Sequence, residues 1–363
     1  MPAPSSTLGA IQTKVRRLTR TPTIAQMSDA TLNEYINTFI VYDIPEHLRL
    51  FNLKRQFTFY TNPFQDTYPT SKDGVMGVPT NPLYNFQNIC LTVHDPVYIA
   101  GFQSMFSQSR EQFFGVYPKI NSIASIGTAG DGLTTSFTGN VNTNLVGTNG
   151  NGYVLLQNEV LFSSVDSNNN GLALIDVPVM NPVTGNPTTI GNLYVPGNTP
   201  TVPPTVVDPV NIINYVTGQF TITFATAPAQ GEAINSQTVP QIATIPQALL
   251  YFDNKFTVRP VPDQPYRVNI EVFMRPTWLM ASSDVPELEE WWQYIAYGAA
   301  KKIFEDRMDS DSVQAIYPEY KKQELLCLRR TIVQNTNQRT ATIYTEQSGV
   351  SNGGWGFGSG SNL

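Results

Sequence analysis

Charge is scarce in this 363-residue chain, and one long segment carries charge of a single sign. Asp, Glu, Lys and Arg make up 14% of the residues, well below the roughly 25% of an average soluble domain. Residues 120–254 contain no lysine or arginine. The acids of this segment are Asp131, Glu159, Asp166, Asp176, Asp208, Glu232 and Asp253. Because electrostatic binding to nucleic acid needs a basic face, the segment is expected not to hold DNA.

Residue types that commonly carry catalysis or bind metals are also few. The chain has two histidines, His47 and His94, and two cysteines, Cys90 and Cys327. No CxxC or HxxxH spacing groups them as zinc ligands, and no G-x-S-x-G elbow or phosphate-binding glycine loop accompanies them. We therefore expect structural histidines, reduced and buried cysteines, no cofactor, no metal and no enzymatic activity. A hydrolase remains an alternative, because two of the acids could meet in the fold.

The loop DSNNNGLALID (166–176) resembles the first half of a calcium-binding loop. Asp166, Asn168, Asn170 and Gly171 occupy its first, third, fifth and sixth positions. The twelfth position, where a bidentate Glu is required, is Val177, and both flanks are strand-like instead of helical. We expect a polar hairpin turn.

Long apolar runs are absent as well. No stretch approaches the about 18 apolar residues that a membrane-spanning helix needs, and the N-terminal sequence MPAPSSTLGAIQTKVRRL is not a secretory signal. We expect no membrane partner and assembly in a cytoplasm.

Helical and strand periodicities occupy different parts of the chain. Helices are expected at 8–20, from Ser28 or Thr31 to Pro45, at 102–114, at 284–307 and at 318–338. Strands are expected at 55–62, 89–93, 267–274 and 340–344, and several more within 120–254, which has no helical periodicity. The predicted class is α+β, with a helical host domain (N-terminal helices plus long C-terminal helices) that contains a few strands and a large inserted β-sandwich or barrel-like domain. The expected divisions are 1–119 and 255–345 for the two parts of the host domain, 120–254 for the inserted domain and 346–363 for a flexible Gly/Ser-rich tail.

The segment DVPELEEWWQYIAYGAAKKIFEDR (284–307) carries aromatic side chains on several faces of its expected helix. One apolar stripe is enough for a helix on the surface of a monomer. Aromatic residues on further faces indicate contacts with another subunit, or a helix buried wholly within its own domain. The candidate subunit-interface residues are Trp291, Trp292, Tyr294, Tyr297 and Phe304.

Two further sets of residues are candidates for contact with partners. The arginines of the first and last expected helices are candidates for partner or DNA contact, with a solvated helix face as the alternative. They are Arg16, Arg17, Arg20, Arg329, Arg330 and Arg339. In the Gly-rich tail, Trp355 and Phe357 are candidate docking residues.

The chain resembles the head-to-tail adaptor (connector ring) proteins of short-tailed double-stranded DNA bacteriophages. The resemblance lies in patterns of helix and strand over residues 7–119 and 255–345. Its sequences are TLGAIQTKVRRLTR, ATLNEYINTFIVYDIPEHLR, FTVRPVPDQPYRVNIEVFMRPTWLM, WWQYIAYGAAKKIFEDRMDSD and YKKQELLCLRRTIVQNTNQRTATIY. Residues 120–254 depart from the family, because this stretch is longer than the smallest adaptors would carry.

The resemblance implies a structural protein of the virion, at the head–tail junction or in the tail. It implies a ring of twelve copies of this chain, with the phage portal protein and tail tube or nozzle proteins as partners. DNA would pass through the lumen without sequence-specific binding, and the seven acids of residues 120–254 are candidates for an acidic lumen or surface. A tail-tube or tail-hub ring protein is the first alternative, and a β-domain that binds glycans is the second.

Overall fold

A computed structural model describes residues 6–48, 50–71, 81–141 and 152–353, with the side chains of 46, 47 and 333–353 excepted. The chain forms two compact units. The first comprises Met1–Arg55, Cys90–Thr92 and Val272–Leu363, and the second comprises Gln56–Ile89 and Val93–Glu271. Helices and extensive sheets are both present, so the α+β class predicted from the sequence is confirmed.

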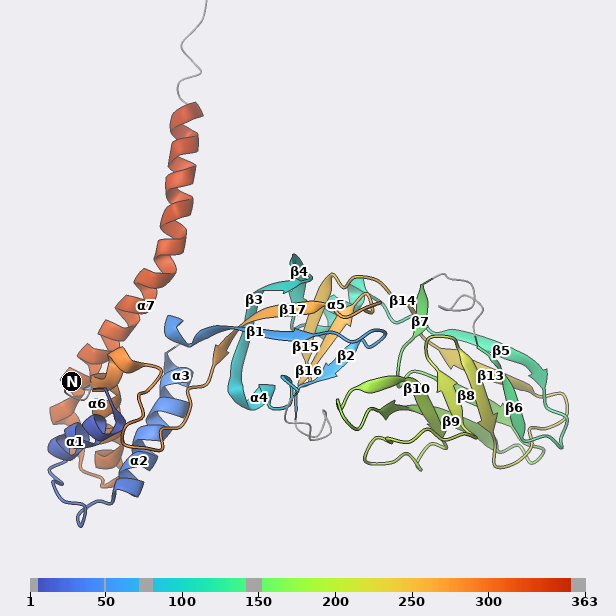
Figure 1. The fold of residues 1–363 in the computed structure, drawn as a ribbon, viewed down its shortest axis with the longest axis horizontal. Coiled ribbons are helices and arrows are strands. Elements are labelled where there is room, and N and C mark those ends of the chain that lie inside the picture. Colours follow the sequence, from blue (N-terminus) through green and yellow to red (C-terminus); the bar gives the residue numbers. More distant parts are fainter. Residues whose placement is uncertain (1–5, 49, 72–80, 142–151, 354–363) are drawn as a thin grey trace, which may run out of the picture. The chain divides into compact units, whose positions relative to one another are not determined.

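Helices build the first unit (Figure 1). Their order is α1 (Leu8–Leu18), α2 (Asp29–Thr38), the π-helical turn η1 (Phe39–Asp43), α3 (Ile44–His47), the 3-10 turns η2 (Phe51–Leu53) and η3 (Glu289–Trp291), α6 (Trp292–Asp306) and α7 (Ser310–Gly353). Thr7 caps α1 through its hydroxyl, which accepts from the Ala10 amide at 3.3 Å. Ser28 caps α2 in the same way, accepting from Thr31 at 3.1 Å.

Helix α6 is the central element of this unit. It packs against α1, α2, η1 and α7, and most of its buried side chains belong to one core with Leu8, Ile11, Ile36 and Ile40. The helix therefore joins the two ends of the chain in a single core.

The first turn of α6 differs from the prediction of a helix over 284–307. The Asp284 carboxylate does not cap a helix, because it accepts from the amides of Met280 and Ala281, both at 2.8 Å. It closes the preceding turn, and α6 begins eight residues later at Trp292. The spacing of Asp284 and Glu287 satisfies the capping pattern in sequence only.

The second unit contains a seven-stranded sheet with the order β1-β17-β3-β4-β15-β16-β2. The strands are β1 (Lys54–Tyr60), β2 (Thr67–Pro69), β3 (Cys90–Ile99), β4 (Phe102–Ser107), β15 (Ala248–Phe252), β16 (Lys255–Arg259) and β17 (Arg267–Met274), with the short helix α4 at Phe86–Ile89. Aromatic rings pack on one another here: the Phe86 ring lies 4.7 Å from that of Phe57 and 5.1 Å from that of Phe256. Such edge-to-face pairs add to the burial of the rings.

The prediction of one helix over 102–114 is wrong. Its first half is strand β4, which pairs with β3 and, in parallel, with β15. Its second half is the short helix α5 (Arg110–Val116), capped by Ser109. Long-range strand pairing outweighs the local apolar spacing at this point.

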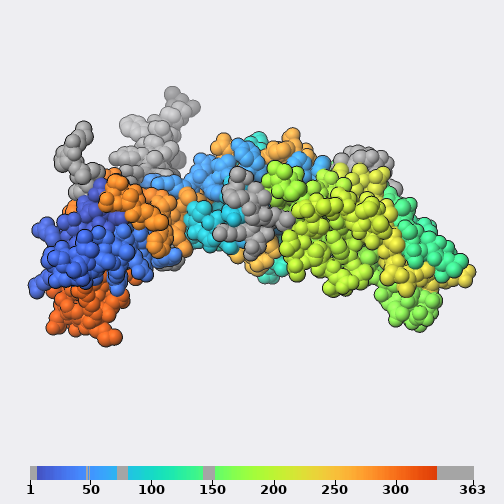
Figure 2. All heavy atoms as spheres, turned by 60° about the horizontal axis from the view of Figure 1, so that its bottom comes forward, coloured from blue at the N-terminus to red at the C-terminus, as the bar shows by residue number. Residues whose placement is uncertain are grey.

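The same unit contains an eight-stranded antiparallel sheet that curls into a nearly closed barrel, and its residues gather as one body of green to yellow spheres (Figure 2). Its order is β5-β13-β8-β9-β10-β11-β12-β6. The strands are β5 (Ser122–Ala129), β6 (Ser136–Asn140), β8 (Leu161–Val165), β9 (Gly171–Met180), β10 (Pro187–Tyr194), β11 (Ile212–Asn214), β12 (Gln219–Thr223) and β13 (Ala233–Thr238), with β7 (Tyr153–Leu155) pairing β14 (Pro240–Ile242). Ile126 and Phe137, from the two edge strands, both contact the core around Phe162. The predicted boundaries at 119/120 and 254/255 lie inside the second unit, outside the first and last strands of this sheet.

The C-terminal helix is longer than the sequence pattern indicates. Helix α7 contains Pro318 without interruption, includes the predicted strand at 340–344 and continues to Gly353, inside the predicted tail 346–363. The strand prediction is therefore wrong. No helix in the described ranges is long and apolar enough to cross a bilayer.

The contact between Gly298 and Phe39 predicts the cost of a single methyl group. A Cβ built on Gly298 would lie about 2.0–2.3 Å from atoms of the Phe39 ring. Gly298→Ala should lower the free energy of unfolding by about 1–3 kcal/mol despite the better helix propensity of alanine. Urea unfolding followed by circular dichroism measures this.

The matched control is Gly115→Ala in α5, where nothing lies within 4 Å of the new Cβ. This variant should be as stable as the parent or more so. Equal effects of the two substitutions would contradict the packing argument, and Phe39→Leu should restore part of the loss in the Gly298→Ala background.

Candidate functional site

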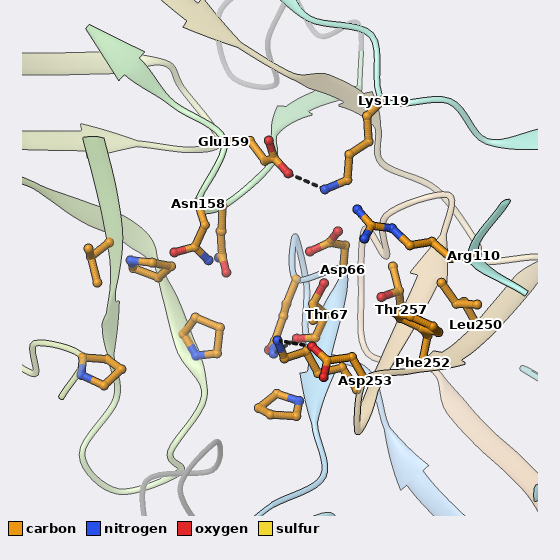
Figure 3. A pocket seen from close by; sticks show the side chains of 18 of the residues that line it. Asp66, Thr67, Arg110, Lys119, Asn158, Glu159, Leu250, Phe252, Asp253 and Thr257 are labelled. Atoms are coloured by element: carbon orange, nitrogen blue, oxygen red, sulfur yellow. Dashed lines mark hydrogen bonds and ion pairs between the residues drawn. The ribbon is translucent and has the colours of Figure 1, made fainter. Parts of the chain in front are cut away.

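A cleft of about 530 Å³ in the second unit brings six charged side chains together (Figure 3). Its size lies in the range of small-molecule sites. The lining includes three acids and three bases together with Phe114, Phe252 and several prolines. The charged residues are Asp66, Arg110, Lys119, Glu159, Asp253 and Lys255.

Ion pairs neutralise the acids of the cleft. Lys119 pairs with Glu159, and Lys255 lies 3.3 Å from Asp253. Asp66 pairs with Arg259, which lies beside the cleft lining, at 2.9 Å. Only Arg110 has no hydrogen bond or ion pair to another described residue, and its guanidinium lies 5.8 Å from the centre of the Phe114 ring.

The Arg259 guanidinium is an unusual buried charge. Its side chain has no exposed surface, and its Nη1 atom donates to the Val258 carbonyl at 3.1 Å as well as pairing with Asp66. The Nε and Nη2 atoms have no partner in the described structure. A buried ion of this kind depends on its counter-ion, since removing either partner leaves an uncompensated charge.

The charged groups of the cleft are arranged in a way that suits the binding of an anionic ligand. A glycoside hydrolase needs two carboxyl groups free to exchange protons and attack, whereas each acid in this cleft is paired with a base. The cation of Arg110 is available to a carboxylate or phosphate group.

A second polar cluster lies inside the barrel. The Asp176 carboxylate accepts from the Asn158 amide at 2.6 Å, the Val160 amide at 2.8 Å and the Tyr215 hydroxyl at 2.7 Å. Burial raises the pKa of Asp176 to about 6, although these hydrogen bonds act in the opposite direction. Gly191 makes the cluster possible, because a Cβ there would lie 2.1 Å from the Tyr215 hydroxyl oxygen.

The seven acids of the lysine-free segment do not form one acidic surface. Asp166 and Asp176 are both 5% exposed, and Glu159 and Asp253 are paired with Lys119 and Lys255. These two lysines flank the segment in sequence and balance its charge in space. Only Asp131, Asp208 and Glu232 remain as unpaired acids, and Asp131 accepts hydrogen bonds from the turn around Thr134, which lowers its pKa to about 2.

The calcium-like loop is a hairpin, as predicted. Asp166 Oδ1 accepts from the amides of Asn168 and Asn170, both at 2.8 Å, and Oδ2 accepts from the Asn170 side chain at 3.0 Å. These bonds hold the turn between β8 and β9 and lower the pKa of Asp166. The carboxylate is therefore committed to the turn. In the described ranges no three His, Cys, Asp or Glu residues cluster as metal ligands.

The aromatic residues of α6 divide into two groups. Tyr294 is 1% exposed and lies within 5.3 Å of the rings of both Phe39 and Tyr320. Phe304 is also buried, at 6% exposure. Both side chains belong to the interior of their own unit, which corrects their assignment to a subunit interface. Trp291, Trp292 and Tyr297 are half-buried at the edge of this core.

The candidate basic residues also have different environments. Arg16 pairs with Asp29 at 2.6 Å and links α1 to α2. Arg330 pairs with Glu290 at 2.5 Å and lies over the Trp291 ring. Both serve the internal structure of the first unit.

The remaining arginines include three that are exposed, which are Arg17, Arg20 and Arg329. The side chain of Arg339 lies outside the described residues, as do Trp355 and Phe357.

Both cysteines are free and buried, as expected. Burial raises the pKa of the Cys90 thiol to about 12 and that of Cys327 to the same value. Neither is a reactive thiol at neutral pH.

Sequence patterns do not reveal the two buried polar clusters. In β16 the side chains of Phe256 and Val258 alternate inward, so Arg259 is expected to point outward, yet it is fully buried. Tyr215 and Asp176 are 39 residues apart, and no spacing rule connects them. No protein-family model and no curated protein matches this sequence.

The Asp66–Arg259 pair predicts a non-additive mutant cycle. Asp66→Ala should lower the free energy of unfolding by about 3–5 kcal/mol, because it leaves the Arg259 charge buried without a counter-ion. Asp66→Ala combined with Arg259→Met should cost clearly less than Asp66→Ala alone, since the double variant removes both charges. Urea unfolding of both variants tests this, and a double variant that is the less stable of the two would contradict it.

The raised pKa of Asp176 predicts how stability depends on pH. In the unfolded chain an aspartate titrates near about 3.9, so the protonated form favours the fold. This contribution is complete below about pH 4 and is lost as the pH rises through about 6. Unfolding free energies of the full chain should therefore fall by about 2–3 kcal/mol between pH 4 and 7.5 from this group.

Asp176→Asn removes the titration and is the control. The variant should be less stable at every pH, because one amide donor must then face another donor, but its profile should lack the Asp176 component. Identical slopes for the variant and the parent between pH 5 and 7 would contradict the assignment.

Proposed function

We propose that this protein is a structural, non-enzymatic component of a bacteriophage virion. It would form a ring that joins the portal to the tail and surrounds the DNA exit channel. The inserted barrel would project from a helical host domain built from the two ends of the chain. The observation that carries the proposal is a group of apolar side chains of α7 that are exposed in the part of the first unit that the structure describes.

Helix α7 packs on α6 and on the 3-10 turn η2. The buried side chains of its described part include Tyr320, Cys327 and Thr331. On other faces Leu325 is 58% exposed, Leu326 is 44% exposed and Ile332 is 59% exposed. Leu325 and Ile332 are seven residues apart and so share one side of the helix. Apolar side chains grouped in this way on a soluble protein favour contact with a partner.

The half-buried aromatic residues of α6 support the same proposal. Trp291, Trp292 and Tyr297 lie at the edge of the helical core, where an adjoining subunit would complete their burial. Tryptophan and tyrosine are enriched in such contacts. The resemblance to the adaptor family then supplies the identity of the ring and of its neighbours, the portal and the tail proteins.

The number of acids that could line the proposed channel is smaller than the sequence indicates. Asp131, Asp208 and Glu232 are the acids of the barrel that stay unpaired, so any acidic lining of a lumen would come from these three. Repulsion of DNA by them would keep the genome mobile. Repulsion of DNA by three acids is weaker than repulsion by all seven acids of the segment would be.

The glycan-binding alternative finds less support. Sugar-binding sites need exposed aromatic faces, but in the barrel Phe137, Phe162, Phe220 and Phe224 are buried in the core. A tail-tube or tail-hub ring protein remains compatible with the same exposed helix face.

Electron microscopy of the purified protein, alone and with portal protein, tests the proposal. We expect closed rings, formed by the chain itself or on the portal. Leu325→Gln, Leu326→Gln and Ile332→Gln together should abolish ring formation or weaken it at least 10-fold in the concentration required, while the variant remains folded, because glutamine is also a good helix former.

Val183→Ser is the control, because Val183 is an apolar side chain at 78% exposure in a barrel turn. It should assemble as the parent does. A protein that stays monomeric with and without portal, or a triple variant that assembles normally, would refute the proposal.

A further inference from the structure

An uncharged cavity of about 520 Å³ lies on the second unit, away from the ion-paired cleft. Its described lining includes Phe102, Tyr117, Ile245 and Pro246, with the amides of Gln103 and Gln247 at its rim and no charged side chain among the described residues. Phe102 is 69% exposed, so one wall of the cavity is an aromatic ring open to solvent. A cavity of this size can accept more than one aromatic side chain.

Apolar side chains lie in and next to the segments that line the cavity. Tyr117 follows α5, and its ring packs 5.6 Å from the buried Phe113 ring. Gln241 donates to the carbonyl of Pro118, the residue after Tyr117, at 3.3 Å, and the neighbouring Ile242 is 49% exposed. Exposed apolar groups around a preformed cavity are typical of a site for an apolar anchor.

The sequence supplies an anchor of matching character at its C-terminus. After Glu346 the chain has no charged side chain, and Trp355 and Phe357 stand between glycines in GGWGFGSGS. Residues two apart point to the same side of an extended chain, so both rings can enter one cavity. Glycines allow the backbone to approach a surface closely.

Helix α7 extends far beyond the part of it whose side chains are described as buried. The last buried side chain described in α7 is Thr331, and the helix continues to Gly353. At about 1.5 Å per residue, these 22 residues extend α7 by about 33 Å beyond that point. Figure 1 shows α7 as a long helix that projects from the other helices of its unit. Such a projection suits contact with a neighbouring molecule.

We propose that the C-terminal segment 354–363 of a second copy of this chain docks in this cavity, with Trp355 and Phe357 as its anchors. The cavity and the tail thus form a head-to-tail link between copies. This link deepens the proposed ring assembly, but the binding reaction can be tested without any ring.

A peptide of residues 347–363 titrated into the full-length Trp355→Ala/Phe357→Ala protein tests the docking by calorimetry. We expect saturable binding with a stoichiometry of one. Phe102→Ser in the protein, or Trp355→Ala in the peptide, should weaken binding at least 10-fold, whereas Val183→Ser, at a remote exposed valine, should leave it unchanged. No saturable binding at peptide concentrations up to about 1 mM, or equal binding by the Phe102→Ser protein, would overturn the proposal.

Oxidative cross-linking identifies the copy that donates the tail. Gln103→Cys and Phe357→Cys proteins, each carrying one new thiol, are mixed and the 103–357 disulfide is sought by mass spectrometry. A 103–357 dimer supports docking between copies. If this disulfide forms only within one chain that carries both substitutions, the tail folds back on its own molecule and the second copy is excluded. Failure of the docking would leave the α7-dependent assembly intact, so the two proposals can fail separately.

Discussion

The contact of Phe39 with α6 at Gly298 is the constraint on which the first unit depends. It brings together segments from the two ends of the chain, which 258 intervening residues separate in sequence. The absence of a side chain at Gly298 lets the ring lie against the helix backbone. Around this contact α6 meets neighbours on several sides, which explains why it is apolar on several faces and why Tyr294 is internal. The central position of this helix accounts for the buried part of its aromatic density.

In the second unit, the acids of the lysine-free segment are partly balanced by bases that lie just outside it in sequence. Lys119 and Lys255 lie just outside the lysine-free segment and pair with Glu159 and Asp253. A count of charges by segment therefore overstates the acidity of the barrel. Buried polar groups show the same dependence: Arg259 relies on Asp66, and Asp176 relies on Tyr215 and two amides. Each of these two buried pairings joins different elements and therefore restrains the fold.

The elements that could be predicted from the sequence are those that depend on interactions between residues close together in the chain. Helix α1, the cap at Ser28 and the hairpin at Asp166 depend on residues within a few positions, and all three were predictable. The helix expected over 102–114 failed because β4 is decided by strands β3 and β15, the latter about 140 residues away. The ion-paired cleft and the Asp176 cluster were not predicted for the same reason, since their residues are far apart in sequence and meet only in the folded chain. Interfaces were the hardest to predict, because a buried aromatic and a docking aromatic have the same periodicity.

The tryptophans are distributed in a way that has an optical consequence. Trp291 and Trp292 lie at the edge of the helical core, Trp278 also belongs to the first unit, and the remaining tryptophan is Trp355. The second unit contains none, so its intrinsic absorption beyond that of the peptide bonds comes from tyrosine and phenylalanine. The two units therefore carry different natural chromophores, and indole emission reports on the first unit and the C-terminal segment while remaining silent about the barrel.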